Sequence, residues 1–344
     1  MSVELLYSRF TMKKIFNLQN ASHWRQLIQW LFLGWCLLLG VQFALFVRHF
    51  ESRGQLDYFS RPPGVEGFLP IGSLVSLKTW IFTGHFDTVH PAALVLFLTF
   101  LAMALLTRKS FCSFICPVGT ASEVGWKLGQ KIFGRNFRIW RGFDLFFQFI
   151  KYALLFFFAK LILFGMPVVA LKEFLAAPYW AIADIKMLHF FTQMSVTSMV
   201  VISVLSLLSV VYKNFWCRYL CPYGALLGLL SMLSPFKITR SRDKCIDCGS
   251  CSRRCPSMID VQHKVRVNSP ECTGCLTCVS HCPEKGALDM AFWKKPISRF
   301  AFIAIVLVVF GGGVLTGMLT DHWQTSLSYR DYQKLIPMAL RLGH

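Results

Sequence analysis

The sequence predicts an all-α integral membrane bundle of about five transmembrane helices, with a small α+β domain on one side. Its 344 residues are 55% hydrophobic and 15% charged. The mean hydropathy of +0.50 is too apolar for a soluble globular protein. Apolar runs of about 18–23 residues are long enough to cross a bilayer. The expected spans lie near residues 26–47, 89–107, 145–166, 194–212 and 298–319.

The small domain is expected where cysteines gather between the fourth and fifth spans. Eight of the 13 cysteines fall there, in two runs that each read C-x2-C-x2-C-x3-C-P. This is the spacing of a bacterial ferredoxin that holds two [4Fe–4S] clusters, in which the fourth cysteine of each run ligates the other cluster. The first cluster would take Cys245, Cys248, Cys251 and Cys282, and the second would take Cys272, Cys275, Cys278 and Cys255. Zinc knuckles and disulfides fit this double spacing poorly.

The distribution of basic residues predicts the orientation. If the N-terminus and the cysteine-rich segment share one side, 25 of the 36 lysine and arginine residues lie there and 9 lie on the other side. The positive-inside rule then makes the ferredoxin side cytoplasmic and the C-terminus periplasmic, in a bacterial inner membrane. A reducing compartment also suits exposed clusters. The net charge of +19 therefore indicates membrane topology, contact with acidic lipid or an acidic redox partner, and cluster neutralisation, and we expect no nucleic-acid partner.

A repeated motif joins the first four spans into two similar hairpins. Cys112 and Cys116 form a CxxxCP motif after the second span, and Cys217 and Cys221 form another 105 residues later, after the fourth. Both hairpins enter from the same side, so we expect parallel repeats whose two corners meet beneath the ferredoxin domain. These four cysteines could hold a third redox centre. Redox-active dithiols and structural thiols remain open alternatives, whereas a cytosolic structural disulfide is disfavoured.

These features divide the chain into seven parts. We expect a cytoplasmic segment (1–25), a first hairpin (26–116), a cytoplasmic connection (117–143), a second hairpin (144–235), the ferredoxin domain (236–296), a fifth membrane helix (297–320) and a periplasmic tail (321–344). Gly313 and Gly317 form a GxxxG pair in the fifth helix, which permits close helix contact within the chain or with a partner.

Three polar residues in or near the spans are candidates for a quinone site. His90 and Glu66 are expected near the outer face, where quinol oxidation needs a proton acceptor. Lys151 lies within the third span, where a buried lysine could meet a quinone oxygen or a carboxylate, or simply reach the interface. Haem bound by His49 with His90, or by His90 with His189, is less favoured because histidines near an interface are usually not haem ligands.

The combination of motifs resembles the NapH/NosR-type membrane polyferredoxins over roughly residues 26–290. The segment Arg61-Pro-Pro-Gly-Val-Glu-Gly-Phe-Leu-Pro70 and Val89-His90-Pro91 also look like a YccM-like electron-transport branch of this family. The resemblance implies an electron conduit between a quinone pool or cytosolic donor and a periplasmic redox partner such as a cytochrome or reductase. A large periplasmic flavin-binding domain is not seen in the sequence, and the fifth span suggests that this helix docks a partner.

We therefore expect a protein that relays single electrons, as a subunit of an oxidoreductase system with possible quinol oxidation. An ion-coupled redox pump is disfavoured because Asp and Glu occur only at the edges of the predicted spans. A redox or iron sensor, or a maturation subunit, remains an alternative that would not need rapid reoxidation by a quinone or cytochrome. A stand-alone enzyme is disfavoured because neither a nucleophile–base set nor a nucleotide-binding glycine loop is visible.

Overall fold

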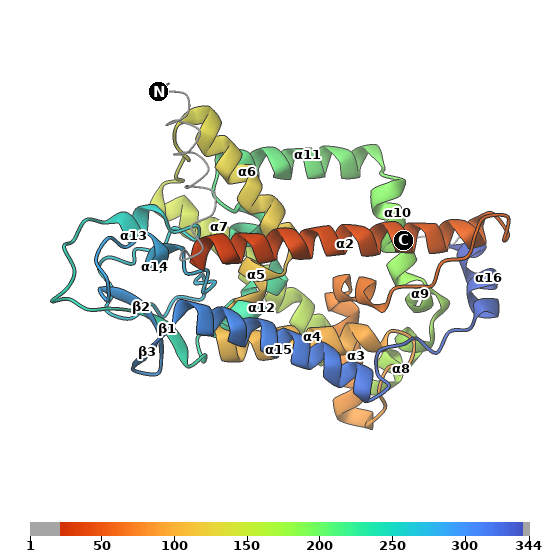
Figure 1. Ribbon diagram of the computed structural model, residues 1–344. Helices are drawn as coiled ribbons and strands as arrows, with labels where there is room; N and C mark the ends of the chain where they lie inside the picture. Colours follow the sequence, from red (N-terminus) through yellow and green to blue (C-terminus); the bar gives the residue numbers. More distant parts are fainter. Residues whose placement is uncertain (1–20, 340–344) are drawn as a thin grey trace, which may run out of the picture.

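The computed structural model describes residues 21–339, so most of the predicted N-terminal segment 1–25 and the last five residues of the tail lie outside the description. Long helices run side by side along the molecule (Figure 1). The small sheet and the cysteine-rich loops lie at one end, here called the ferredoxin end, and α8, α9 and α16 lie at the opposite far end.

Three helices among the described residues are long and apolar enough to cross a membrane. They are α2 (Ala21–Glu51), α7 (Arg141–Lys160) with its π-helical extension η2 (Leu161–Gly165), and α15 (Arg299–Leu319). They match the predicted first, third and fifth spans. The predicted fourth span coincides with α11 (Val196–Val211), which is bent by 77° from α10 (Ala183–Thr192), and the two together could form one broken span.

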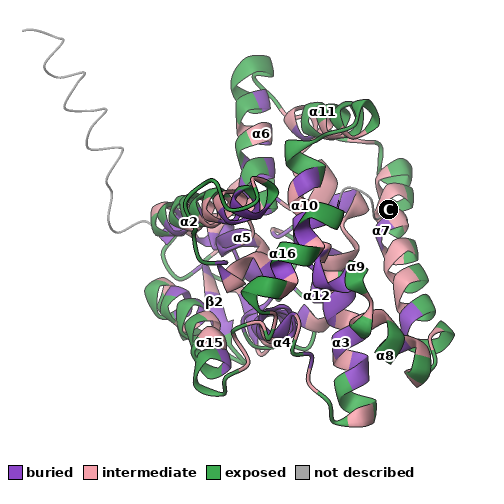
Figure 2. Ribbon diagram, turned by 90° about the vertical axis from the view of Figure 1, so that its right-hand side faces the viewer, coloured by how far each residue is buried: buried purple, intermediate pink, exposed green. Residues whose placement is uncertain are grey.

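The predicted second span is the 17-residue helix α4 (Pro91–Thr107), which is apolar and largely buried. Pro91 occupies its first turn, where the missing N–H costs no helical hydrogen bond. The helix α15 packs along α4, and a Cβ added to Gly313 or Gly317 would come within 2.2 Å of Thr99 or 2.7 Å of Val95. The glycine pair therefore makes its close contact within the chain. Figure 2 shows that buried residues gather near the middle of the molecule, around α4 and α12.

Each CxxxCP motif forms a corner between two helices. In the first corner, α5 (Phe111–Phe114) leads to α6 (Pro117–Phe133); in the second, η3 (Trp216–Leu220) leads to α12 (Pro222–Ser231). The second cysteine of each motif caps the new helix and the proline begins it. Cys221 Sγ accepts a hydrogen bond from Gly224 N at 3.2 Å. The sequence repeat thus corresponds to a repeated local geometry.

Short helices close the far end. They are η1 (Pro63–Phe68), α3 (Pro70–Thr83), α8 (Val168–Ala176), α9 (Pro178–Ala181) and, in the tail, α16 (Tyr329–Met338). Lys78 of α3 donates to the carbonyls of Ile162 and Met166, at 3.0 and 2.6 Å, which satisfies the open end of η2. The tail folds back so that Tyr332 is buried against Phe46.

The ferredoxin end contains a three-stranded antiparallel sheet in the order β1-β2-β3, formed by β1 (Phe236–Arg240), β2 (Leu288–Phe292) and β3 (Lys295–Ile297). Strands β1 and β2 flank the cysteine runs and pair with Phe236 opposite Phe292 and Arg240 opposite Leu288. One helical turn lies in each run, α13 (Ser250–Arg253) and α14 (Thr277–Ser280). Pairing β1 with β2 therefore closes the segment that contains all eight cysteines.

Candidate metal centres

The eight ferredoxin cysteines line two separate cavities. One is lined by Cys245, Cys248, Cys251 and Cys282, which we call the exposed set. The other is lined by Cys255, Cys272, Cys275 and Cys278, which we call the buried set. Each cavity combines three cysteines of one run with the fourth cysteine of the other. This is the grouping that the sequence spacing predicts for two cubanes.

The two sets differ in their access to solvent. Cys248 is exposed and the other members of the exposed set are partly buried, whereas all four cysteines of the buried set are buried. Burial raises the pKa of the Cys255 thiol to about 12. A thiol in such surroundings ionises only with a positive centre beside it, as when it coordinates a metal.

The backbone around the second cysteine of each run is left-handed on both sides. Asp247 and Gly249 flank Cys248 with φ of 50° and 69°, and Gly274 and Leu276 flank Cys275 with φ of 63° and 59°. Positive φ values cost free energy for residues other than glycine. Each run has one glycine, so one of its two left-handed positions is occupied by another residue, Asp247 or Leu276. The same turn occurs twice, so both cysteine loops have the same fold.

The four CxxxCP cysteines, here called the corner set, come together although the sequence separates them by 105 residues. Cys217 lies close enough to the other three thiols that a negative charge on any one of them would oppose its ionisation. The four thiols, including Cys112, Cys116 and Cys221, are therefore near neighbours. Burial raises the pKa of Cys112 to about 11 and that of Cys116 to about 12. A reactive dithiol needs a lowered thiol pKa, so this environment disfavours redox-active dithiols and is compatible with metal ligands or structural thiols.

The corner set and the buried set face the same small cavity. It has a volume of about 50 Å³, room for a few ordered waters, and Cys112, Cys217 and Cys275 line it. The cations Arg25, Lys109 and Arg218 also line it. The carboxylates of Glu123 and Glu271 line it as well, so the lining has a small excess of positive charge that would offset part of the negative charge of thiolate-bound clusters.

Hydrogen bonds from both corners hold the loops of the buried set. In the first corner, Arg108 donates to Ser269 O at 2.8 Å and Ser113 to Thr273 O at 2.9 Å. In the second corner, Asn214 donates to Pro256 O at 3.3 Å and Arg218 to Ser257 O at 2.6 Å. The sequence does not predict these contacts, because the residues that make them are far apart in the chain and the cysteine spacing does not specify which of them pair.

Among residues 21–339, no group of three or more His, Cys, Asp or Glu side chains is arranged to hold a single metal ion. A [4Fe–4S] cluster is larger than an ion, and its four thiolates stand apart around it. Four cysteines around one cavity, in each of the two ferredoxin sets, therefore fit a cubane by donor chemistry.

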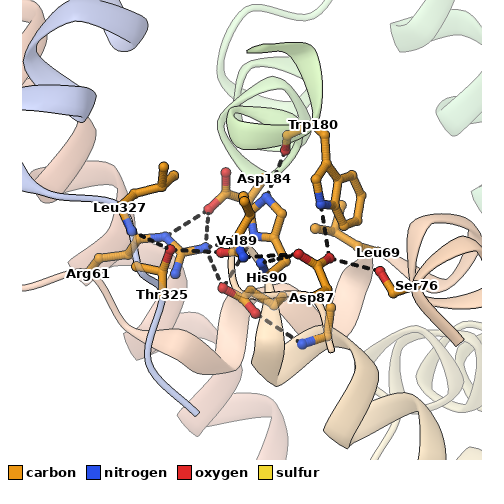
Figure 3. A network of polar contacts seen from close by, with 12 residues as sticks. Arg61, Leu69, Ser76, Asp87, Val89, His90, Trp180, Asp184, Thr325 and Leu327 are labelled. Atoms are coloured by element: carbon orange, nitrogen blue, oxygen red, sulfur yellow. Dashed lines mark hydrogen bonds and ion pairs between the residues drawn. The ribbon is translucent and has the colours of Figure 1, made fainter. Parts of the chain in front are cut away.

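His90 lies in a buried polar network at the far end with Arg61 and Asp184 (Figure 3). Glu66 is also buried and belongs to this network. His90 Nδ1 lies 3.2 Å from Glu66 Oε1, and Arg61 bridges Glu66 and Asp184 at 2.8 and 2.6 Å. His90 Nε2 lies 2.8 Å from Trp180 O. These contacts join η1, α4 and α10, although Arg61 Nη1 is buried without a hydrogen-bond partner.

Lys151 lies elsewhere. It is the one buried residue of α7, and its Nζ pairs with the carboxylate of Glu271, the residue before Cys272. Of the two partners foreseen for a buried lysine, the structure provides the carboxylate. The three quinone candidates therefore do not converge.

The histidines considered for haem are engaged by the protein. Each ring nitrogen of His49 has one hydrogen-bond partner: Leu56 O for Nδ1 and Tyr329 Oη for Nε2. Each ring nitrogen of His90 also lies within hydrogen-bond distance of a partner. His189 Nε2 lies 3.0 Å from Glu51. Neither His49 nor His90 thus offers a free nitrogen for a haem iron.

A larger cavity of about 300 Å³ lies between α2, α4, α15 and the η1 segment. Its lining is almost wholly apolar and includes Trp35, Cys36, Phe310 and Trp323. Ile115 and Pro117 at the first CxxxCP corner line it on one side, and Gly64 and Phe68 of η1 line it on another. Its volume and lining are typical of a small-molecule site.

Comparison with known proteins bears on these centres. Residues 237–283 match a family described as a 4Fe-4S dicluster domain, and residues 89–136 and 192–241, which contain the two corners, match one described as a 4Fe-4S binding domain. YccM of Escherichia coli (strain K12), named for a proposed role in electron transport, is 40% identical over 337 residues, which cover 95% of this chain and 93% of YccM. The chain belongs to this family of ferredoxin-type membrane proteins.

More distant relatives extend the family. The ferredoxin-type protein NapH of Escherichia coli (strain K12) is 25% identical over 76% of this chain and 85% of NapH. The regulatory protein NosR of Pseudomonas aeruginosa is 30% identical over 52% of this chain, which corresponds to a quarter of NosR. No solved structure matches the chain. The resemblance to NapH/NosR-type polyferredoxins predicted from the motifs is confirmed.

Proposed function

We propose that the protein is a membrane-bound iron–sulfur carrier that relays single electrons between its ferredoxin end and a redox partner in or beyond the membrane. The observation that carries the proposal is the order of the three cysteine sets. The exposed set meets solvent, the buried set lies next, and one small cavity separates the buried set from the corner set. This order provides a route from solvent to the membrane helices.

The exposed set and the buried set would each hold one [4Fe–4S] cluster. When bound, the clusters supply one-electron redox chemistry, and the protein supplies their position and surroundings. Cys255 and Cys282 would tie the two runs together by each ligating the cluster of the other run. Arg25, Lys109 and Arg218 would stabilise negative charge at the inner end of the route.

The corner set would hold the third redox centre. Four thiols from two symmetric corners lie together beside the buried set, and the segments that carry them match a 4Fe-4S binding family. The raised thiol pKa values argue against a reactive dithiol. We favour a metal cluster over the two alternatives that the sequence left open.

The proposed location is the bacterial inner membrane, with the ferredoxin end in the cytoplasm. The excess of lysine and arginine on that side of the chain supports this orientation. Helix α4 would be a further crossing, short because other helices surround it, and α10 with α11 another. The protein would then cross the membrane five times and end in the periplasm.

A quinone is the proposed membrane-side partner, and the 300 Å³ apolar cavity is its proposed site. The cavity reaches from the first corner to η1, so a bound ring could exchange electrons with the corner set. Reduction of one quinone consumes two electrons, delivered singly, and two protons from the adjacent aqueous phase. Glu66 belongs to η1 and contacts His90, so these two residues could serve proton exchange, whereas Lys151 has its role at the ferredoxin end. A periplasmic redox subunit is the remaining partner.

Substitution in the corner set tests the route. In Cys112→Ser or Cys221→Ser, we expect the dithionite-reduced ferredoxin clusters to persist while their reoxidation by a quinone in liposomes is lost. Val204→Ser is the control, because Val204 lies on the exposed face of α11, outside the three cysteine sets and outside the apolar cavity. Wild-type reoxidation rates in both corner variants would overturn the proposed route.

The same assay tests the cavity. Cys36→Trp would fill the cavity and should slow quinone reduction, whereas Leu37→Trp, at the next position of α2 and 62% exposed, should not. Equal rates in the two variants would remove the quinone from this cavity.

A further inference from the structure

The loop that leads into the second cysteine run is held by residues at the end of α4, in α5 and in α12. This anchor loop (residues 269–273) ends at the first two residues of the second cysteine run. Arg108 binds Ser269 O, Ser113 binds Thr273 O, and the carbonyl of Pro270 lies so near α12 that a Cβ on Gly228 would come within 2.7 Å of it. Neighbours of Cys272 on both sides are thus fixed.

Glu271 is the charged centre of the anchor loop. Its Oε1 accepts from Lys151 Nζ and lies 3.3 Å from Tyr152 Oη, and its Oε2 lies 4.0 Å from Lys109 Nζ. The side chains of Lys151 and Lys109 are 0% and 4% exposed. One carboxylate of the ferredoxin segment therefore reaches between a lysine of membrane helix α7 and a lysine of the first corner.

Stability alone is a poor reason for this arrangement. Removing three charged groups from water costs free energy that their attraction only partly returns, and apolar side chains would often stabilise the protein as well. Buried ion pairs are better attested as devices that fix register. Lys109 lies close to Cys112, Cys217 and Cys221 as well as to Glu271. The ion pairs of Glu271 therefore fix the position of the buried set relative to the corner set.

We propose that Glu271 is a positioning residue that holds the buried set at a fixed separation from the corner set and so sets the rate at which electrons cross between them. The inference rests on the proposed redox role of the corner set. One electron leaves the buried-set centre and one enters the corner-set centre at each crossing, with the quinone as final acceptor. Glu271 acts through Lys151 and Lys109 and itself exchanges no electron.

Three variants, two of them single substitutions of Glu271, separate geometry from charge. Glu271→Gln keeps the size and removes the charge, and Glu271→Asp keeps the charge and shortens the reach. Glu271→Gln combined with Lys151→Met removes one negative and one positive charge, so the net charge of the group formed with Lys109 is unchanged if the single variant is unstable. Glu284→Gln is the matched control, because Glu284 is an exposed carboxylate two residues after Cys282 of the exposed set.

We expect all variants to keep their iron and acid-labile sulfide. Electron crossing should slow about 10-fold or more in Glu271→Gln, in Glu271→Asp and in the double variant, as is typical when groups that orient metal ligands are removed. Glu284→Gln should match the wild type. The magnetic interaction between the reduced centres, measured by EPR, should weaken in the Glu271 variants, and amide hydrogen exchange in residues 269–273 should rise.

The outcomes are distinguishable. One outcome is that Glu271→Asp has the wild-type rate of electron crossing and an unchanged EPR interaction, while Glu271→Gln alone has a shifted midpoint potential. Glu271 would then be a charge that tunes the potential, and the inference would be overturned. A slow Cys112→Ser/Cys217→Ser variant beside a wild-type Glu271→Gln rate would overturn it while the proposed function stands. Wild-type rates in that double cysteine variant would overturn the proposed function and the inference together.

Discussion

Arg25 and Glu123 join the start of the first membrane helix to the helix after the first corner. Their two hydrogen bonds are 2.7 Å each, and the side chains are 2% and 11% exposed. Burial opposes ionisation of Glu123, but the hydrogen bonds and charge of Arg25, aided by Lys127, outweigh it and lower the carboxyl pKa to about 2. The pair therefore remains charged at all physiological pH values.

We predict that Glu123→Gln lowers the stability of the protein by about 3 kcal/mol, because it leaves Arg25 buried and without a counter-charge. The measurement is the thermal unfolding midpoint in detergent. Lys127→Gln is the control, since its side chain is 41% exposed and such pairs contribute about 1 kcal/mol or less.

The same substitution has a defined pH dependence. Because the pKa of Glu123 is lower in the folded protein than in the unfolded chain, its ionised carboxylate stabilises the folded state. This stabilisation is complete above the unfolded pKa of 4.5 and is lost as the pH falls toward the folded pKa of about 2. The difference between wild type and Glu123→Gln should therefore be constant from pH 8 to pH 5. A difference that shrinks within this range would contradict the assigned ion pair.

Individual residues show where sequence reasoning ends. The cysteine sets could be foreseen because ferredoxin spacing is local, and the loops that carry it repeat one backbone turn. The Lys151–Glu271 pair could not, since 120 residues separate its members and nothing local marks them as partners. A lysine inside a span and an acid beside a cluster cysteine were the only available signals.

At the scale of elements, the contact between α4 and α15 depends on two small residues. Gly313 and Gly317 let the helices approach, whereas Gly311 and Gly312 of the same helix have no atom within 4 Å of an added Cβ. Close contact between membrane helices is favoured by small residues because backbones then meet directly. One face of α15, marked by Gly313 and Gly317, therefore packs against α4, and the face marked by Gly311 and Gly312 does not contact the rest of the described chain.

We predict that Gly313→Ala destabilises the protein by about 1–3 kcal/mol, because the new methyl group must displace Thr99. Gly312→Ala should be neutral or slightly stabilising. Unfolding of the two variants in the same detergent provides the comparison. Equal loss of stability in both would contradict the assigned packing face.

Apolar length predicted α2, α7 and α15, which are long enough to be recognised by composition alone. It also predicted α4 and α11, whose ends differ from those of the expected spans by two residues or fewer, but it did not predict the bend between α10 and α11. Helix α4 is surrounded by other elements and needs less apolar length, and the bend between α10 and α11 follows the break at residues 193–195. His90 and Glu66 were expected together near the outer face, but the other members of their ion-pair network, Arg61 and Asp184, were not foreseen, because Asp184 comes from a distant segment of the chain.

At the scale of the whole molecule, three cysteine sets and one apolar cavity follow one another from the ferredoxin end into the membrane helices. The access to solvent falls from the exposed set to the buried set. The cations Arg25, Lys109 and Arg218 gather where the buried set meets the corner set. The account depends on one link, namely that the corner set holds metal.

Iron and acid-labile sulfide per protomer test that link most directly. The measurement uses anaerobically purified protein beside the Cys112→Ser/Cys217→Ser variant, which changes one thiol in each corner. We predict about 12 iron atoms in the wild type and about 8 in the variant, as expected for three and two [4Fe–4S] clusters. About 8 iron atoms in both proteins would contradict the third centre and leave the route without its final step.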